Sequence, residues 1–482
     1  MAAELHGVDP RSGEQLPGVV ETNPAELDRA CALAAATAPR LEQFPGAERA
    51  RLLHAVADAL AGAEEELVTR ADTETALGTS RLHSELARTT GQLRMFAELV
   101  ASGADREVIS EETDPNAAPV PRPALHRVLR PIGPVAVYAA GNFPFAFSIA
   151  GGDTASALAS GCPVVVKAHP GHPVTSQRTG ELVQAALTEA GAPAGSFATV
   201  HGYAAGERLV ADPRVAAAAF TGSQRGGRAL FDLATSRPDP IPFYGELGSV
   251  NPVFVTEQAV ASRGSEIVDG FVGSFTLGGG QFCTKPGVLL LPAGHGLDGA
   301  LTAAVRQAAP AALLTAATSE TFQTGVADRG GRGGVRTLHT GDTHSPGHWA
   351  APALHATDVA TLHADPSLLE ECFGPTAMVV EYTGEAELAR AARLFPGSLT
   401  ATVHAEDNDD ELVRPLLAEL ARRAGRIVWN GWPTGVAVTA AMHHGGPWPA
   451  TTAPLHTSVG TTAIRRFLVP VTYQNVPARL LP

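Results

Sequence analysis

The sequence is poor in lysine, in net positive charge and in long apolar runs. Of its 482 residues only two are lysine, against 33 arginines, and the acidic residues outnumber the basic ones to give a net charge of −14. This balance disfavours electrostatic binding of nucleic acid. No apolar run reaches the roughly 18 residues of a membrane-spanning helix. The opening residues MAAELHGVDP have no basic stretch before an apolar one, so neither a membrane span nor a signal peptide is expected.

Cysteine is also scarce. The chain has four cysteines, namely Cys31, Cys162, Cys283 and Cys372. They are too few and too scattered for a disulfide scaffold, so reduced thiols in a cytoplasmic protein are expected. The scarcity of lysine makes Lys167 and Lys285 informative, because a lysine that persists among so many arginines suggests a need for a compact ammonium group. This argument favours a functional Lys167 and leaves Lys285 open.

The hydrophobic pattern changes along the chain. The first hundred residues predict helices, starting with Asn23 as the N-cap residue before Pro24. From VAVY (135–138) onward, apolar runs alternate with helical segments, which predicts βαβ units and a mostly parallel sheet. A second alternating region begins near residue 249. Residues 318–348 between its strands are rich in Gly, Thr, His and Arg, and predict a mobile loop.

Cys283 lies in GGGQFCTKPG, where a glycine run allows the backbone to bend sharply and expose amides. A nucleophilic thiolate needs a lowered pKa, from a helix N-terminus or a nearby cation such as Lys285. The alternative is a small buried thiol, which is the better interpretation of Cys31 and Cys162 in their Ala-rich or strand-edge contexts.

Two further residues follow predicted strands. Glu246, in YGELGSVNP, stands between a strand and a glycine turn, a position that faces the cleft at the carboxyl end of a parallel sheet. Asn142, in AAGNFPF, is held rigid by Pro144 and can donate to a developing oxyanion. The alternatives are a surface-loop glutamate and an Asx-turn residue.

A phosphate site is predicted at FTGSQRGG (220–227), where a strand, a Thr-Gly-Ser turn and a helix follow one another. The helix N-terminal amides and the Ser223 hydroxyl would meet a pyrophosphate there. This turn is not the GxGxxG fingerprint, which is not found in the right context, and the sequence has no P-loop and no GxSxG elbow. No metal cluster is expected either, because His169 and His172 lie in a proline-rich loop.

The combination of motifs resembles the aldehyde dehydrogenase superfamily. The segments NFP, VVVK, FTGS, ELG, GQFC and ECFGP occur in the order typical of that family, from about residue 8 to the C-terminus. Longer segments, including GQFCTKPG and MHHGGPWPATT, resemble the α-ketoglutaric semialdehyde (2,5-dioxovalerate) dehydrogenase branch. That branch also includes long-chain fatty aldehyde dehydrogenases of luminous bacteria.

The resemblance implies roles for the catalytic residues. Cys283 would be the nucleophile, Glu246 the general base, and Asn142 together with the Cys283 backbone N–H the oxyanion hole. The cofactor residues it implies are Lys167 for the adenosine ribose, Ser223 with Gly222 and Gly227 for the pyrophosphate, Glu371 for the nicotinamide ribose and Phe373 beside the nicotinamide.

Cofactor choice and substrate recognition are predicted from single residues. No acid follows Lys167 in Lys167-Ala168-His169-Pro170, so NADP is expected to serve at least as well as NAD, with Arg208 as a second phosphate contact. A substrate carboxylate needs a cation, and Arg88 is the candidate because the family helix matching residues 80–101 borders the substrate tunnel. Helical spacing sets Arg88 off the apolar stripe, however, so a solvated or ion-paired arginine is the alternative.

The expected fold class is α/β, aldehyde dehydrogenase-like, with two Rossmann-like doubly wound parallel-sheet domains and a small β extension for oligomerisation. The expected division assigns 1–112 and 132–248 to NAD(P) binding, 249–440 to catalysis, and 113–131 with 441–482 to oligomerisation or bridging. A homodimer or homotetramer without nucleic-acid or membrane partners is expected.

The expected function is NAD(P)-dependent oxidation of an aldehyde to an acid through a Cys283 thioester, with α-ketoglutaric semialdehyde as substrate and 2-oxoglutarate as product. One alternative is a fatty or other aliphatic aldehyde dehydrogenase. Another is an acylating relative that passes the thioester to a second thiol, which Glu246 argues against because a deacylating base would not help it. The last is a non-catalytic protein of this fold, which the Cys283, Glu246 and Asn142 set argues against.

Overall fold

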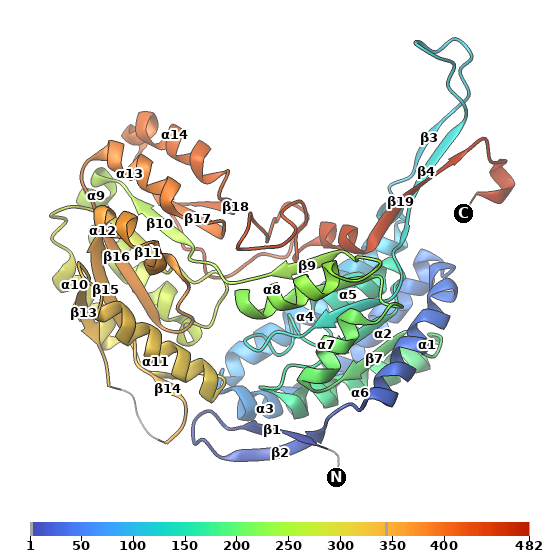
Figure 1. Ribbon diagram of the computed structural model, residues 1–482, viewed down its shortest axis with the longest axis horizontal. Coiled ribbons are helices and arrows are strands. Elements are labelled where there is room, and N and C mark those ends of the chain that lie inside the picture. The colour runs from blue at the N-terminus through green and yellow to red at the C-terminus, as the bar shows by residue number, and fades with distance from the viewer. Residues whose placement is uncertain (1–2, 343–345, 482) are drawn as a thin grey trace.

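A computed structural model describes the chain except for residues 1–2, 343–345 and 482. It forms two sheet-containing bodies side by side and a narrow arm (Figure 1). The chain begins with a hairpin, β1 (Glu4–Val8) and β2 (Gln15–Val20), which the purely helical prediction for this region missed. Four helices follow: α1 (Pro24–Glu42), α2 (Gly46–Gly62), α3 (Glu64–Thr75) and α4 (Thr79–Ala101). Asn23 caps α1 through a capping box with Glu26, as its sequence predicts.

The first body is built on a five-stranded sheet in the order β7-β6-β5-β8-β9, with all neighbours parallel. Its strands are β5 (Val135–Tyr138), β6 (Val164–Lys167), β7 (Phe197–Val200), β8 (Ala217–Thr221) and β9 (Phe243–Glu246). The connecting helices are α5 (Gly152–Ser160), α6 (Pro173–Glu189), α7 (Tyr203–Ala211) and α8 (Gln224–Thr235). Helices cover both faces, which is why the inner strands are almost wholly apolar.

The second body has a seven-stranded sheet in the order β13-β15-β16-β11-β10-β17-β18, parallel except for β13. Its strands are β10 (Pro252–Val255), β11 (Val288–Pro292), β13 (Arg336–Thr340), β15 (Ala353–Asp358), β16 (Thr376–Tyr382), β17 (Ser398–His404) and β18 (Ala424–Trp429). Its helices are α9 (Glu257–Thr276), α10 (Asp298–Gln307), α11 (Ala316–Gly330), α12 (Val359–Ala364), α13 (Glu385–Ala391) and α14 (Asp410–Leu420). A short strand pair, β12 (Ala311–Ala312) with β14 (Trp349–Ala350), lies beside it.

The prediction of a mobile loop over 318–348 is wrong for most of that segment. Helix α11 covers its first part, and β13 pairs with β15 to form the antiparallel edge of the second sheet. The polar composition reflects position rather than mobility, because this helix and edge strand are largely exposed. Residues 343–345 lie outside the described part of the chain.

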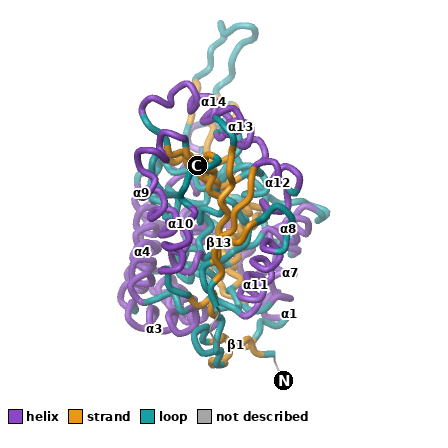
Figure 2. The backbone as a smooth tube through the Cα atoms, turned by 90° about the vertical axis from the view of Figure 1, so that its left-hand side faces the viewer, coloured by secondary structure: helices purple, strands orange, loops and turns teal. Residues whose placement is uncertain are grey.

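The arm is a three-stranded antiparallel sheet in the order β19-β4-β3, formed by β19 (Leu468–Gln474), β4 (Leu125–Pro131) and β3 (Ile109–Glu111). The loop joining β3 and β4 projects away from both bodies in two perpendicular views (Figures 1 and 2). None of the described helices has the length and hydropathy needed to cross a bilayer.

An irregular segment connects the end of the second sheet to the arm and passes the end of β9 on its way. The Leu247 amide donates to the Ala450 carbonyl, and Glu246 forms an isolated β-bridge with Thr451. These contacts place residues from the C-terminal part of the chain against the carboxyl end of the first sheet, where the polar residues predicted from the sequence gather.

Candidate active site

Cys283 follows a sharp bend. Gly278, Gly279 and Gly280 have φ of +57°, +69° and +65°, a region that other residues rarely adopt. At Gly280 a Cβ atom would also lie 2.2 Å from the Gly374 carbonyl oxygen. The bend ends in a turn in which the Cys283 backbone N–H donates to no described residue. Asn251 fixes the far side of the turn by donating to the Cys283 carbonyl at 2.8 Å.

Glu246 is the last residue of β9 and is 4% exposed. Its position at the carboxyl end of a parallel strand agrees with the sequence prediction. The Ser458 hydroxyl donates to one of its carboxylate oxygens, Oε2. The other oxygen, Oε1, lies 2.9 Å from Nε2 of His444.

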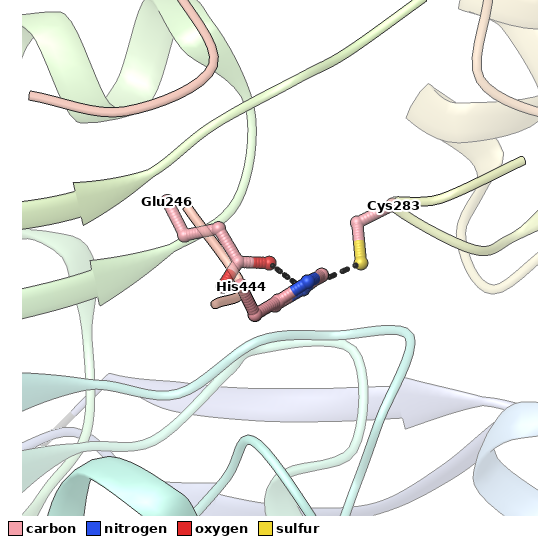
Figure 3. Close-up of side chains that lie close together, drawn as sticks. All are labelled: Glu246, Cys283 and His444. Carbon is pink, nitrogen blue, oxygen red and sulfur yellow. Dashed lines mark hydrogen bonds and ion pairs between the residues drawn. The ribbon is translucent and has the colours of Figure 1, made fainter. Parts of the chain in front are cut away.

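His444 completes this group, and the sequence analysis missed it. Its Nε2 lies 3.5 Å from the Cys283 Sγ, so one imidazole nitrogen faces both the thiol and the Glu246 carboxylate (Figure 3). The segment MHHGGPW carried the residue, but neighbours in sequence gave no reason to prefer it to His443. The assignment of 441–482 to oligomerisation or bridging is therefore incomplete, because His444 and Ser458 from that segment contact the catalytic candidates.

The pKa of the Cys283 thiol differs from the lowered pKa that the sequence analysis expects of a nucleophile. Burial, followed by the nearby Glu246 carboxylate, raises the pKa of Cys283 well above its usual range. Lys285 does not lower it, because its Nζ points away and donates to the carbonyls of Cys372 and Thr376, at 2.8 Å each. Burial would raise the pKa of Glu246, but the His444 imidazole and the Ser458 hydroxyl outweigh burial and lower it. The resting thiol is therefore protonated, and the carboxylate beside it is ionised.

The same three side chains have the donor types that zinc prefers. The ligand atoms of Cys283, His444 and Glu246 all lie within 4.8 Å of one another, close enough to hold a metal ion after small rotations. The expectation of no metal cluster did not foresee this grouping, because its members are up to 198 positions apart in sequence. An ion there would occupy the thiolate and so block it as a nucleophile.

Asn142 lies on the loop after β5, and its Nδ2 donates to the Gln281 carbonyl at 3.0 Å. It thereby reaches the same turn that holds Cys283. Glu85 on α4 holds this loop in place, since its carboxylate accepts hydrogen bonds from the backbone N–H groups of Phe145 and Ala146 at 2.8 and 3.0 Å. The sequence prediction of a rigidly held amide close to the thiol is consistent with this geometry.

Arg88 is half-buried and forms no ion pair among the described residues, although it lies off the apolar stripe of α4. The helix has a second covered face, which carries Arg81, Glu85, Arg88 and Gln92. The Arg88 guanidinium lies 5.6 Å from the Phe147 ring centre, and its Nε and Nη2 are buried without acceptors. Burial lowers the pKa of Arg88, while Cys283, Glu85 and Glu246 act to raise it. The guanidinium is thus an unsatisfied donor beside the catalytic group.

The residues predicted to bind a dinucleotide line the end of the first sheet. Lys167 ends β6, lies 4.8 Å from the Tyr203 ring centre and is 8% exposed. Burial lowers the pKa of Lys167 to about 8, and the Glu21 carboxylate partly opposes this. Arg208 is exposed on α7, without an ion-pair partner among the described residues.

The Thr-Gly-Ser turn has the predicted form. Ser223 caps α8 and accepts the Gly226 amide at 3.2 Å, while Gly222 donates to the Glu246 carbonyl at 3.0 Å. At Gly227 a Cβ atom would lie 2.1 Å from the Leu247 side chain, so glycine allows the helix to approach the end of β9. The exposed amides at the start of α8 suit a pyrophosphate.

Glu371 approaches the same edge from the second body. Its Oε2 would lie 2.2 Å from a Cβ atom at Gly248, two residues beyond Glu246. Burial raises the pKa of Glu371 to about 7, although the Lys285 ammonium opposes this. Phe373 is half-buried in the same loop. A lysine, a capped helix N-terminus and a carboxylate along one edge suit the adenosine, pyrophosphate and nicotinamide-ribose parts of NAD(P).

Comparison with known sequences gives full-length similarity. Residues 2–448 match the aldehyde dehydrogenase family. The chain is 43% identical to α-ketoglutaric semialdehyde dehydrogenase 2 of Azospirillum brasilense, covering all of this chain and 93% of that protein. It is 41% identical to α-ketoglutaric semialdehyde dehydrogenase of Acinetobacter baylyi, covering 95% and 88%.

Solved structures share the fold. Aldehyde dehydrogenase C of Pseudomonas syringae, solved with NAD+ and octanal, superposes with a TM-score of 0.80 at 20% identity, over 98% of this chain and 93% of that one. PnpE in complex with nicotinamide adenine dinucleotide gives a TM-score of 0.82 at 22% identity, over 100% and 96%. The α/β architecture with mostly parallel sheets is therefore the one predicted.

Proposed function

Because this chain belongs to the aldehyde dehydrogenase family and is an NAD(P)-dependent oxidoreductase of aldehydes, we propose that it oxidises α-ketoglutaric semialdehyde to 2-oxoglutarate. Two relatives that match almost the whole chain carry that activity in their names. The observation that carries the proposal is the Arg88 guanidinium beside Cys283, whose buried Nε and Nη2 have no acceptors among the described residues. A carboxylate at the far end of a short aldehyde would satisfy them.

Catalysis begins with the thiol. Its raised pKa means that the proton must leave, to solvent, as the reaction starts. Nε2 of His444 lies 2.9 Å from the ionised Glu246 Oε1, which can only accept, so Nε2 carries a hydrogen. This N–H, 3.5 Å from Sγ, is placed to stabilise the thiolate. In this proposal His444 activates the nucleophile, a role that a lowered thiol pKa would have made unnecessary.

The thiolate attacks the aldehyde carbon, so an S–C bond forms and the carbonyl π electrons move to oxygen. The Asn142 Nδ2 and the Cys283 backbone N–H stabilise this oxyanion, Asn142 by exchanging its bond to the Gln281 carbonyl for one to substrate. Bound NAD(P) supplies the acceptor for the hydride that leaves the aldehyde carbon, which is thereby oxidised to a thioester. Lys167, Ser223 and Glu371 would hold the adenosine ribose, pyrophosphate and nicotinamide ribose.

Hydrolysis needs a base. Glu246, ionised in the resting site, removes a proton from water as the water oxygen attacks the thioester carbon. The C–S bond then breaks, the thiolate is released, and the carboxylic acid departs. A base next to the sulfur favours release of a free acid over transfer to coenzyme A.

For the cofactor we propose that NADP serves at least as well as NAD. The segment from Lys167 to Pro170 contains no acid that would repel a 2′-phosphate, and Arg208 offers a second positive charge. Glu21, from the end of the N-terminal hairpin, is the carboxylate that acts on Lys167. Glu21→Gln should therefore shift the ratio of kcat/KM values further toward NADP, and a strong preference for NAD in the wild type would contradict the proposal.

We also propose the domain division given by the sequence, with residues 444–458 added to the catalytic site, and a cytoplasmic homodimer or homotetramer. The four cysteines, all unpaired, support a reducing compartment.

The test is formation of reduced cofactor from α-ketoglutaric semialdehyde and from hexanal, each with and without coenzyme A. The proposal expects higher kcat/KM for the semialdehyde, 2-oxoglutarate as product and no effect of coenzyme A. A preference for hexanal would favour the aliphatic aldehyde alternative, and dependence on coenzyme A would favour an acylating enzyme. Cys283→Ala should be inactive and folded; equal activity in that variant would contradict the mechanism.

A further inference from the structure

Arg81, one residue before the apolar stripe of α4 begins, lies where three separate segments of the chain meet. Its Nη2 donates to the Asn142 carbonyl at 2.6 Å. Its guanidinium carbon lies 5.0 Å from the Phe143 ring centre and 4.5 Å from that of Phe282. The sequence analysis gave this arginine no role, and the mechanism above does not use it.

The two aromatic rings are the immediate neighbours of the two oxyanion donors. Phe143 follows Asn142, and Phe282 precedes Cys283. The rings also contact each other, edge to face, with centres 5.3 Å apart and an interplanar angle of 86°. The cation therefore contacts both donor-bearing segments, one from the first body and one from the second.

The packing leaves the guanidinium little freedom. A Cβ atom at Gly278 would lie 2.5 Å from the Arg81 Nη1, so the glycine bend before Cys283 is shaped around this side chain. Glu85, one helical turn further along α4, holds the Phe145 and Ala146 amides, so the same helix fixes the Asn142 loop at two points. A planar cation between two aromatic rings is a contact that lysine reproduces poorly.

The geometry points to Arg81 as a positioning residue of the oxyanion hole, one that fixes the Asn142 amide relative to the Cys283 N–H by binding Asn142 and both adjoining phenylalanine rings. The inference rests on the proposed role of Asn142 and Cys283 as oxyanion donors. It assigns Arg81 no contact with substrate, which distinguishes it from Arg88. A small displacement of one donor is enough to slow a reaction by about a hundredfold.

The experiment compares Arg81→Met and Arg81→Lys with wild type, and uses Arg94→Met as the matched control. Arg94 is on the same helix, but its side chain is 42% exposed and, among the described residues, its one ion pair is with Asp58. Dehydrogenase activity is measured with hexanal, which has no carboxylate. Acylation of Cys283 by p-nitrophenyl acetate, which forms a tetrahedral oxyanion without cofactor, is measured alongside. Both Arg81 variants should lower both rates by about 10- to 100-fold, with KM for NADP unchanged and Arg94→Met equal to wild type.

Two further readouts separate positioning from general damage. Alkylation of Cys283 by iodoacetamide forms no oxyanion, so its rate should stay close to wild type in both Arg81 variants. In an Asn142→Ala background, Arg81→Met should lower the oxidation and acylation rates by less than about threefold, because Arg81 acts through Asn142. Slow alkylation, full additivity with Asn142→Ala, or an unchanged rate with hexanal would each overturn the inference. If Asn142→Ala itself kept full activity, that result would refute the proposed oxyanion hole and not the role of Arg81 alone.

Discussion

His444 faces Cys283 with Nε2 3.5 Å from Sγ, although 160 residues separate them along the chain. The thiol is buried beside a carboxylate that disfavours its ionisation, so the Nε2–H of the imidazole is a group within reach that can stabilise the thiolate. Nucleophile activation and thioester hydrolysis thus share one cluster, and substitutions within it should separate the two steps.

His444→Gln should slow thiolate formation. Because a hydrogen bond to a charged group contributes about 1.5–3 kcal/mol, kcat for aldehyde oxidation should fall by about 10- to 200-fold. Iodoacetamide alkylation of Cys283 at pH 7 should slow with it and recover at high pH, where hydroxide ionises the thiol. His443→Gln, one residue earlier, is the control and should keep near-normal kinetics. Unchanged alkylation in the His444 variant would refute the role.

Glu246→Gln should impair hydrolysis more than hydride transfer. The amide cannot remove a proton from water, yet the thioester can still form, so rapid mixing should give one equivalent of reduced cofactor per active site followed by a slow steady state. A steady-state rate equal to that of wild type, or no burst at all, would contradict the assignment of Glu246 as the deacylation base.

Arg88→Ala should raise KM for α-ketoglutaric semialdehyde and leave that for hexanal almost unchanged. Losing a charge-assisted contact with a carboxylate costs about 1.5–3 kcal/mol, which corresponds to a 10- to 200-fold rise. Arg94→Ala, on the exposed side of the same helix, serves as the control. Equal effects on both aldehydes would exclude carboxylate recognition by Arg88.

Cofactor binding should weaken with alkali. Burial lowers the pKa of Lys167 to about 8, so the free enzyme carries the positive charge below that pH and loses it above. KM for NADP should therefore rise between pH 7 and pH 9, and Lys167→Arg, which stays charged, should flatten the profile. A profile identical to that of wild type in this variant would show that another group is responsible.

Zinc should inhibit reversibly. The thiolate, imidazole and carboxylate of the cluster can bind one Zn²⁺, which blocks attack on the aldehyde. Equilibrium dialysis should find one ion per chain in wild type, less in His444→Gln and none in Cys283→Ala, with EDTA restoring activity. Cys31→Ala, a buried thiol on α1 remote from these ligands, is the control. Binding that survives Cys283→Ala would place the metal elsewhere.

The sequence by itself determined the parallel-sheet architecture and the main catalytic candidates. Strands such as Val164–Lys167 are buried on both faces, so their sequences are almost wholly apolar. The glycines before Cys283 are needed because the backbone there has positive φ. Glu246 ends β9, and Asn142 lies on the loop after β5. Periodicity and spacing are enough to find the strands and the glycine bend, which are local features, whereas the catalytic roles of these residues come from the resemblance to the family. The edge strand Arg336–Thr340 escaped detection because an exposed strand lacks that signal.

Only the tertiary structure decided which polar residues join the site. His444 comes from an irregular segment, and nothing in its sequence neighbourhood distinguishes it from His443; its role appears only where that segment passes the end of β9. Arg88 and Arg81 lie off the apolar stripe of α4, and periodicity predicts exposure for such positions. Both are half-buried because the helix has a second face, covered by the Asn142 loop and the Cys283 turn. A sequence pattern reports how a helix meets the core, whereas long-range packing determines which polar side chains are enclosed with it.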